Sequence, residues 1–148
     1  MRIEQKGLEK MTSQLEKAVK KLHEEGCALV VVNGGEFVSH QPGLAPLVNL
    51  LKNSPEMLQG GSVADKIVGK AAAFLLLYGG VKEVYAEVIS SHALAVLERA
   101  GVKLEFNKKV PFIKNRAGTD TCPMEKRVLD IDDVETGAAA LLSLFGAS

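Results

Sequence analysis

Residues 60–80, GGSVADKIVGKAAAFLLLYGG, carry the most information about the fold. Ser62 can cap a helix, and Asp65 three residues later completes an arrangement that resembles a capping box. From residue 71 to residue 78 there is no polar face, and a helix that is apolar on all sides is buried. The glycines at positions 79 and 80 end the pattern. The stretch therefore predicts a long and largely buried helix over residues 62–78.

Two lysines and a glycine are unusual within this predicted helix. Lys66 and Lys70 are four residues apart and would share one stripe, so that Lys70 projects from near the buried half. The aliphatic stem of Lys70 can carry its charge to solvent. If the ammonium is instead enclosed, it needs an anionic partner, either a protein carboxylate or a ligand phosphate or carboxylate. In a helix interior, glycine at position 69 would lower the free energy of unfolding by about 1 kcal/mol relative to alanine. A close contact with either a sheet or a ligand would explain why a glycine stands there.

Apolar spacing, cap residues and glycine stops predict the remaining elements. They are a helix over 8–25, a hairpin within 27–40, a helix over 43–53, a strand over 82–90, a helix over 91–101, a strand over 102–106, a broken connection over 108–121, and terminal helices over 122–130 and 133–145. This order is typical of an α/β domain with three α/β/α layers and a mixed sheet. We expect one domain over 1–148, with an N-terminal helix in 1–26 and a helical tail at 121–148.

Glu87 is a charged residue in the otherwise mostly apolar strand VYAEVIS, residues 84–90. A carboxylate in a central strand needs a partner, and Lys70, from the helix that precedes the strand, is one candidate. The alternative is an edge strand on which Glu87 lies in water. The position of this strand in the sheet therefore separates the two alternatives: a central strand favours a pair with Lys70, and an edge strand places Glu87 in water.

The composition excludes several classes of partner. Eighteen basic and eighteen acidic residues give a formal net charge of zero, so nothing attracts the chain generally to nucleic acid or anionic membranes. Aromatic residues are sparse, and the longest uncharged apolar stretch, 71–81, is too short to span a bilayer. The N-terminus has no apolar signal-peptide core, and two cysteines do not make a disulfide framework. A cytoplasmic protein without nucleic-acid or membrane partners is expected.

Three motifs carry a resemblance to a known family. GGSVADKIVGKAAA at 60–73, VYAEVIS at 84–90 and NRAGTDTCPMEK at 115–126 together resemble a small uncharacterised bacterial family assigned to the cytidine-deaminase-like fold. The resemblance covers about 27–132. It implies a mixed sheet opened by a hairpin, with helices packed on both faces, which agrees with the element order above.

The zinc motifs of the working deaminases are absent from the expected positions. These enzymes place H-x-E or C-x-E at the start of the helix after the hairpin, and P-C-x-x-C after the next strand. The first position falls on GGSVAD, which offers only Asp65, and the second on ISSHAL, which offers His92 but no cysteine. Cys122 lies downstream in CPME, which reverses the Pro–Cys order and lacks a second thiol. We therefore expect no zinc-dependent deamination, no metal site and no cofactor.

Two classes of function stay open. The first is a zinc-free protein that binds a small nucleotide-like or phosphorylated metabolite, with or without a metal-independent hydrolase or group-transfer reaction. The second is a non-enzymatic ligand sensor or scaffold. The first helix is rich in lysine and glutamate, which is usually a solvated face but also allows pairing into a homo-oligomer.

The candidate site residues follow from chemistry and position. Helix N-termini and cationic side chains can bind an anion, and a cysteine at a helix start can act as a nucleophile if its pKa is lowered. The candidate catalytic residues are Cys122, Asp65, Lys70 and Glu87. The candidate ligand-binding residues are Ser62, Lys66, Asn115, Arg116 and Thr119.

Overall fold

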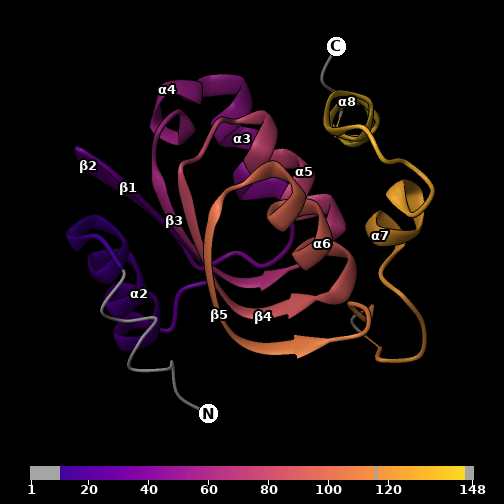
Figure 1. The fold of residues 1–148 in the computed structure, drawn as a ribbon, viewed down its shortest axis with the longest axis horizontal. Helices are drawn as coiled ribbons and strands as arrows, with labels where there is room; N and C mark the ends of the chain where they lie inside the picture. The colour runs from indigo at the N-terminus through magenta and orange to yellow at the C-terminus, as the bar shows by residue number, and fades with distance from the viewer. Residues whose placement is uncertain (1–10, 116, 146–148) are drawn as a thin grey trace.

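The structure, a computed structural model, describes residues 11–115 and 117–145 and has a mixed α/β fold with a five-stranded sheet (Figure 1). The strands are β1 (Leu29–Asn33), β2 (Gly35–Ser39), β3 (Ser62–Val68), β4 (Glu83–Ser90) and β5 (Lys103–Val110), in the spatial order β2-β1-β3-β4-β5. Strand β1 is antiparallel to β2 and β3, whereas β3, β4 and β5 are parallel. The predicted mixed sheet with a hairpin at one edge is confirmed, and Gly34 adopts the positive φ of 80° that the tight turn requires.

The described residues contain seven helices. They are α2 (Ser13–Glu25), α3 (Ala45–Asn53), α4 (Pro55–Leu58), α5 (Lys70–Tyr78), α6 (Ser91–Ala100), α7 (Pro123–Val128) and α8 (Val134–Leu144). The helix after the hairpin, the helix between the last two strands and the two terminal helices are confirmed. The predicted start of the first helix at residue 8 lies outside the described residues. Among the described residues, no helix has the length and apolar character needed to cross a bilayer.

The predicted helix over 62–78 is wrong in its first half, which forms strand β3. Residues 62–65 pair with β1 on one edge, and β3 pairs with β4 on the other. Backbone hydrogen bonds on both edges and burial on both faces favour the strand over a local capping pattern. Gly69 has an extended backbone, and helix α5 begins only at Lys70. Ser62, Asp65 and Lys66 are therefore strand residues, and Lys66 shares no helical stripe with Lys70.

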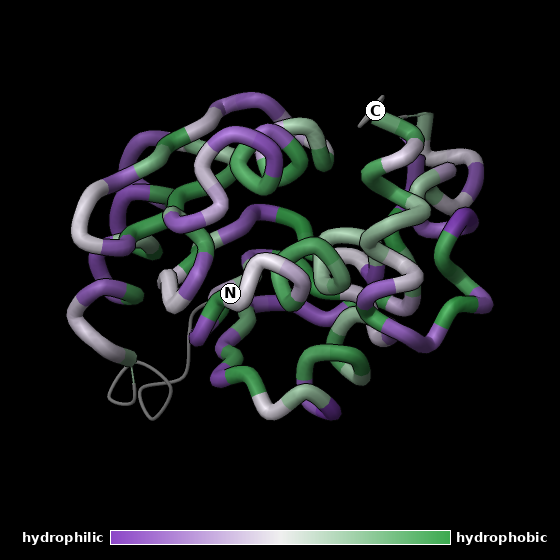
Figure 2. The backbone as a smooth tube through the Cα atoms, turned by 90° about the horizontal axis from the view of Figure 1, so that it is seen from above, coloured by the Kyte–Doolittle hydropathy of each residue, from purple (hydrophilic) through white to green (hydrophobic). Residues whose placement is uncertain are grey.

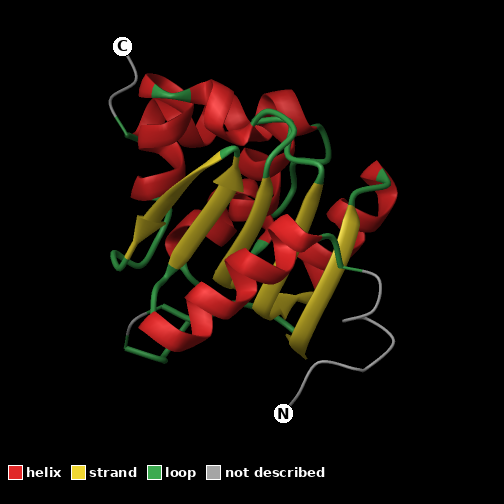
Figure 3. Cartoon of the chain, turned by 90° about the vertical axis from the view of Figure 1, so that its left-hand side faces the viewer, coloured by secondary structure: helices red, strands yellow, loops and turns green. Residues whose placement is uncertain are grey.

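Helices cover both faces of the sheet. Helix α2 crosses one face (Figure 3), where its apolar side packs on alternate residues of β1, β3 and β4 such as Val30, Ala64 and Tyr85. Helices α3, α5, α6 and α8 form the larger core on the opposite face. The outer helices mix apolar and polar residues and turn an apolar side toward the sheet, whereas the central strands, covered on both faces, are mostly apolar (Figure 2). Every residue of α5 from Lys70 to Leu76 is buried.

Glu87 does not pair with Lys70. Strand β4 lies between β3 and β5, so the edge-strand alternative is also wrong. The Glu87 carboxylate accepts hydrogen bonds from the Tyr85 hydroxyl (2.6 Å) and the Asn107 amide (2.5 Å), and lies 2.7 Å from Nε2 of His23 on α2. Burial opposes its ionisation, but these three hydrogen bonds hold the pKa of Glu87 below its usual value. Glu87 therefore helps to attach α2 to the sheet.

Gly137 is the contact point between helices α8 and α5. A Cβ atom at Gly137 would lie 2.3 Å from Cδ2 of the buried Phe74 ring. We therefore expect Gly137→Ala to lower the free energy of unfolding by about 2 kcal/mol through overpacking. Urea unfolding measures this, with Ser143→Ala at an exposed position of α8 as the control. A gain of about 1 kcal/mol, the usual benefit of alanine over glycine in a helix, would contradict the close contact.

Candidate functional site

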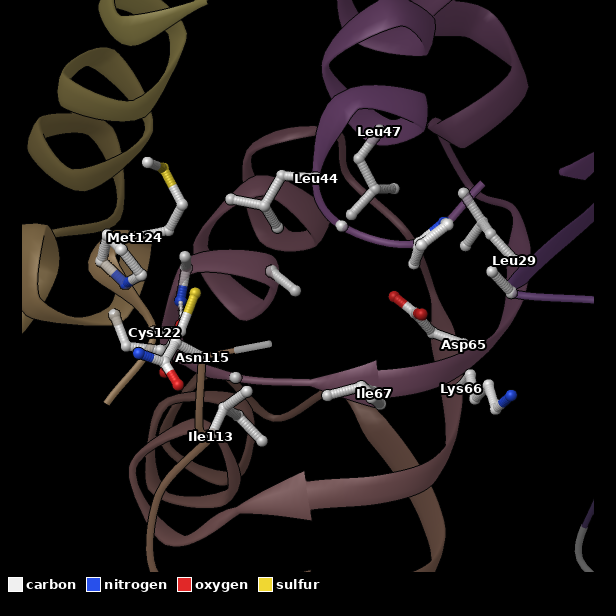
Figure 4. A pocket seen from close by; sticks show the side chains of 18 of the residues that line it. Leu29, Leu44, Leu47, Asp65, Lys66, Ile67, Ile113, Asn115, Cys122 and Met124 are labelled. Carbon is white, nitrogen blue, oxygen red and sulfur yellow. Dashed lines mark hydrogen bonds between the residues drawn. The ribbon is translucent and has the colours of Figure 1, made fainter. Parts of the chain in front are cut away.

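A cavity of about 470 Å³ lies beside the N-terminal ends of α3 and α5 and the connection between β5 and α7. Side chains alternate along β3, so Asp65 and Ile67 face α3 and α5 together with Val63. Lys66 faces the opposite way. Figure 4 shows the Asp65 carboxyl directed into the cavity and the Cys122 sulfur on the opposite wall. The fold therefore brings together two of the predicted catalytic residues across one pocket.

Asp65 is more than nine-tenths buried. Burial raises the pKa of its carboxyl from an ordinary value near 3.8 to about 7, against the opposing effect of the Ile67 and Lys66 backbone N–H groups. Within the described residues, no side chain or charged group contributes to stabilising its ionised form. Around neutral pH the Asp65 carboxyl therefore exchanges between its protonated and ionised forms, so it can both donate and accept a proton inside the cavity.

Glu125 is bound to the first turn of α5. Its two carboxylate oxygens accept hydrogen bonds from the backbone N–H groups of Lys70 (2.7 Å) and Ala71 (2.8 Å). A carboxylate at a helix N-terminus satisfies free donors and interacts favourably with the helix dipole. The approach is so close that a Cβ atom on Gly69 would lie 2.5 Å from the carboxylate. Gly69 is thus explained by a neighbouring side chain, rather than by a sheet or a bound ligand.

Lys70 is buried, but it does not lie on the cavity wall. Its ammonium donates a hydrogen bond to the Leu129 carbonyl (2.8 Å), just after helix α7, and lies 5.6 Å from the centre of the Phe74 ring. The predicted anionic partner is therefore replaced by a backbone carbonyl and an aromatic face. Together with the Glu125 cap, this contact attaches both ends of α7 to α5.

Cys122 occupies the N-cap position of α7, and Pro123 begins the helix, where a proline is well tolerated. The Cys122 backbone N–H donates to the Ile113 carbonyl (2.8 Å), which closes the base of the loop between them. Inside that loop, the Asn115 side-chain oxygen accepts the Thr119 N–H (3.0 Å). Asn115 and Cys122 are consequently held on the same part of the cavity wall.

The other predicted residues lie away from the cavity interior. Ser62 is buried and donates to Glu83. Lys66 contributes to the wall, but its exposed side chain extends away from the cavity (Figure 4). Thr119 is exposed in its loop, while Arg116 lies outside the described residues. Within the described ranges, no group of three or more His, Cys, Asp and Glu side chains could hold a metal ion.

Several contributors to the site were not predicted. The apolar walls come largely from Leu44 and Leu47 at the start of α3 and from Ile113 before the loop. Nothing local to these residues indicates a cavity, because their apolar side chains also fit an ordinary core. Glu125 lies in the first turn of α7, but its carboxylate caps α5 rather than its own helix. The glycine at position 69 was the one sequence signal of that close approach, although it precedes α5 instead of lying in a helix interior as predicted.

A family model matches residues 17–144 and is described as TM1506: Domain of unknown function (DUF1893). The chain belongs to the DUF1893 family. A crystal structure of a DUF1893 family protein (TM1506) from Thermotoga maritima has a TM-score of 0.84 and 36% sequence identity to it, and covers 91% of this chain and 92% of that chain. No curated protein matches. The prediction of an uncharacterised family is confirmed at this level, and the cavity lies within the DUF1893 domain.

Proposed function

We propose that this DUF1893 protein binds a small molecule in the cavity between β3, α3 and the β5–α7 connection. The observation that carries the proposal is Asp65, a buried carboxyl directed into a mostly apolar cavity with no side-chain partner among the described residues. Burying a carboxyl that has no charged partner destabilises a fold, so its presence inside a cavity supports a role in recognition. A volume of about 470 Å³ is in the usual range for small-molecule sites.

We also propose that this mixed α/β fold is cytidine-deaminase-like. It is supported by the strand order β2-β1-β3-β4-β5, by the antiparallel hairpin at one edge and by helices on both faces. With the boundaries that the structure gives, the helix after the hairpin is α3 and the helix after the next strand is α5. The zinc-motif positions therefore move from 60–65 and 89–94 to the starts of α3 and α5.

The residues at the corrected positions do not fit a zinc ion. The start of α3 reads Gly43-Leu44-Ala45 and the start of α5 reads Gly69-Lys70-Ala71, and neither offers an imidazole or a thiol. The first N–H groups of α5 are bound by Glu125. The proposed function therefore contains no step through a metal.

The same contacts favour one of the predicted ligand types over the other. A phosphate would use the N-terminus of α5, but two of its N–H groups are already bound to Glu125. A nucleotide-like ligand would instead place its ring against the apolar wall and a polar edge on Asp65. The geometry thus supports a ligand recognised through its ring or apolar body rather than through a phosphate.

A catalytic version of the proposal rests on Cys122. Its thiol lies on the wall opposite Asp65, so a bound molecule would have a nucleophile on one side and a proton carrier on the other. Lys70 and Glu87 lie outside the cavity, which reduces the predicted catalytic set to these two residues. Metal-independent hydrolysis or group transfer remains one prediction, and a non-enzymatic sensor or scaffold is the other.

Cys122 provides a direct test of cavity binding. Iodoacetamide should modify Cys122 in the folded protein, whereas Cys27 is 1% exposed and should react only after unfolding. A compound that fills the cavity at about 100 times its Kd should slow modification of Cys122 about 100-fold and raise the unfolding free energy by about 2.7 kcal/mol. Mass spectrometry identifies the modified cysteine, and Cys122→Ser is the control.

The screen behind this test needs a broad library of nucleosides, heterocycles, amines and sugar phosphates. A compound that raises the melting temperature without protecting Cys122 binds elsewhere on the protein. If no compound in the library both stabilises the protein and protects the thiol, small-molecule binding in the cavity is contradicted, and a scaffold function is favoured.

A further inference from the structure

The cavity wall is mostly apolar, which indicates the chemistry of the larger part of a ligand. Apolar side chains from β1, the start of α3, β3, α5 and the segment before the loop form most of its surface (Figure 4). They are Leu29, Leu44, Leu47, Ile67, Ala72 and Ile113. Removing apolar ligand surface from water is favourable in rough proportion to the area buried. The body of the ligand should therefore be a hydrocarbon or an aromatic ring.

The polar end of the ligand would meet Asp65. Its carboxyl is the acidic group that Figure 4 shows pointing into the open space. Ionising this carboxyl without a partner is unfavourable in the buried site, as the direction of its pKa shift indicates. A group that carries positive charge and N–H donors compensates for the lost hydration most completely.

The charged groups around Asp65 do not supply that compensation. Lys66 on β3 and Lys114 in the β5–α7 connection both have exposed side chains. Glu125 of α7 adds a second carboxylate, which is bound to the N–H groups of α5. The other titratable group on the wall is the Cys122 thiol.

The remaining parts of the cavity wall add no positive charge near Asp65. Residues 28–29 of β1 and its approach, residues 41–44 before α3, and Leu47 carry no charge. Lys70, behind the wall, is bonded to the Leu129 carbonyl. Among the described residues, the interior of the cavity thus offers carboxyl groups and no enclosed ammonium or guanidinium group.

We propose that the cavity binds an organic cation, a protonated amine or amidinium group on an apolar body, with Asp65 as its counter-ion. This inference rests on the proposed function and adds the charge of the ligand. An amidinium group can donate two parallel hydrogen bonds to a carboxylate, which gives orientation as well as affinity. A neutral amide pairs less strongly, and an anion is repelled by the carboxylates.

Three matched compounds test the charge. Benzamidine, benzamide and benzoate share a phenyl ring and a planar polar group, but are respectively cationic, neutral and anionic at pH 8. Isothermal titration calorimetry of the full chain should show benzamidine binding at least about tenfold more tightly than benzamide, a difference of about 1.4 kcal/mol, with no measurable binding of benzoate.

Variants of Asp65 and of an exposed aspartate make the test specific. Asp65→Asn should weaken benzamidine binding at least about tenfold and leave benzamide affinity within about twofold. Asp132→Asn, at an exposed position outside the cavity, should change neither. Near pH 7, benzamidine binding should release protons from wild-type protein and none from Asp65→Asn, because part of the Asp65 population is protonated before binding. Titrations in phosphate and Tris, which differ in ionisation enthalpy, measure the released protons.

The failures of the two proposals are distinguishable. Equal affinity for benzamidine and benzamide, or benzamidine affinity that Asp65→Asn leaves unchanged, overturns the cation assignment. If none of the three compounds binds, the cation assignment is also overturned. In each of these cases, protection of Cys122 by a neutral compound of the library decides separately whether cavity binding itself survives.

Discussion

Replacing Glu125 with alanine is expected to lower the free energy of unfolding by about 3 kcal/mol. The carboxylate accepts two short hydrogen bonds from the buried N–H groups of Lys70 and Ala71, and alanine would leave both donors without a protein partner. It would also remove one of the two polar contacts that attach α7 to α5, and would leave the Lys70 contact to the Leu129 carbonyl as the other. Urea unfolding followed by circular dichroism measures the loss, and hydrogen exchange locates it.

Two further variants separate the cap from a general effect of losing a carboxylate. Glu98→Ala, at an exposed position of α6, should change stability by less than about 0.5 kcal/mol. Glu125→Gln keeps the volume but can present only one acceptor, so it should also be destabilising. Exchange of the Lys70 and Ala71 amides should speed up in both Glu125 variants. Unchanged exchange at these two amides would show that the Glu125 contacts do not stabilise the start of α5.

Elements with a complete local signal could be predicted from the sequence. The Asn33-Gly34-Gly35 sequence is typical of tight hairpin turns and rare in other elements, and α6 has a serine cap and a closing glycine. Residues 62–68 have a local signal that favours the wrong element, because Ser62 and Asp65 have the spacing of a capping box. The strand forms there because β1 and β4 pair with its two edges, and those partners are distant in sequence.

The site was only partly predictable for a related reason. Asp65, Asn115 and Cys122 were selected by chemistry, and the fold places all three on one cavity. Glu87 is separated from Asp65 because Asp65 is in register with Ala86, so the next residue of β4 points to the opposite face. If β4 were shifted by one residue relative to β3, Glu87 would lie beside Asp65 on the same face, and the sequence alone does not determine this register.

Asp65→Asn is expected to make the protein more stable relative to wild type as the pH rises. The folded protein holds the Asp65 proton with a pKa of about 7, whereas the unfolded chain releases it near 3.8. Because the folded state binds the proton more tightly, the wild type loses stability as pH increases through this window. The loss between pH 4 and pH 8 is about 4 kcal/mol at 1.36 kcal/mol for each pKa unit. Asparagine does not titrate, so the variant lacks this loss.

Urea unfolding of both proteins at pH 4, 6 and 8 measures the difference. The advantage of Asp65→Asn over wild type should grow steadily across the series, and Asp132→Asn, exposed in its loop, serves as the control substitution. A constant difference between Asp65→Asn and wild type would mean that Asp65 ionises as freely in the folded protein as in the unfolded chain. The cation proposal makes a further prediction at pH 8, because benzamidine binds the ionised carboxyl. Benzamidine should raise the free energy of unfolding of the wild type by RT ln(1 + [L]/Kd), and should leave that of Asp65→Asn nearly unchanged. A carboxyl that destabilises the empty protein at pH 8 would thus stabilise the occupied one, as expected of a residue retained for binding rather than for folding.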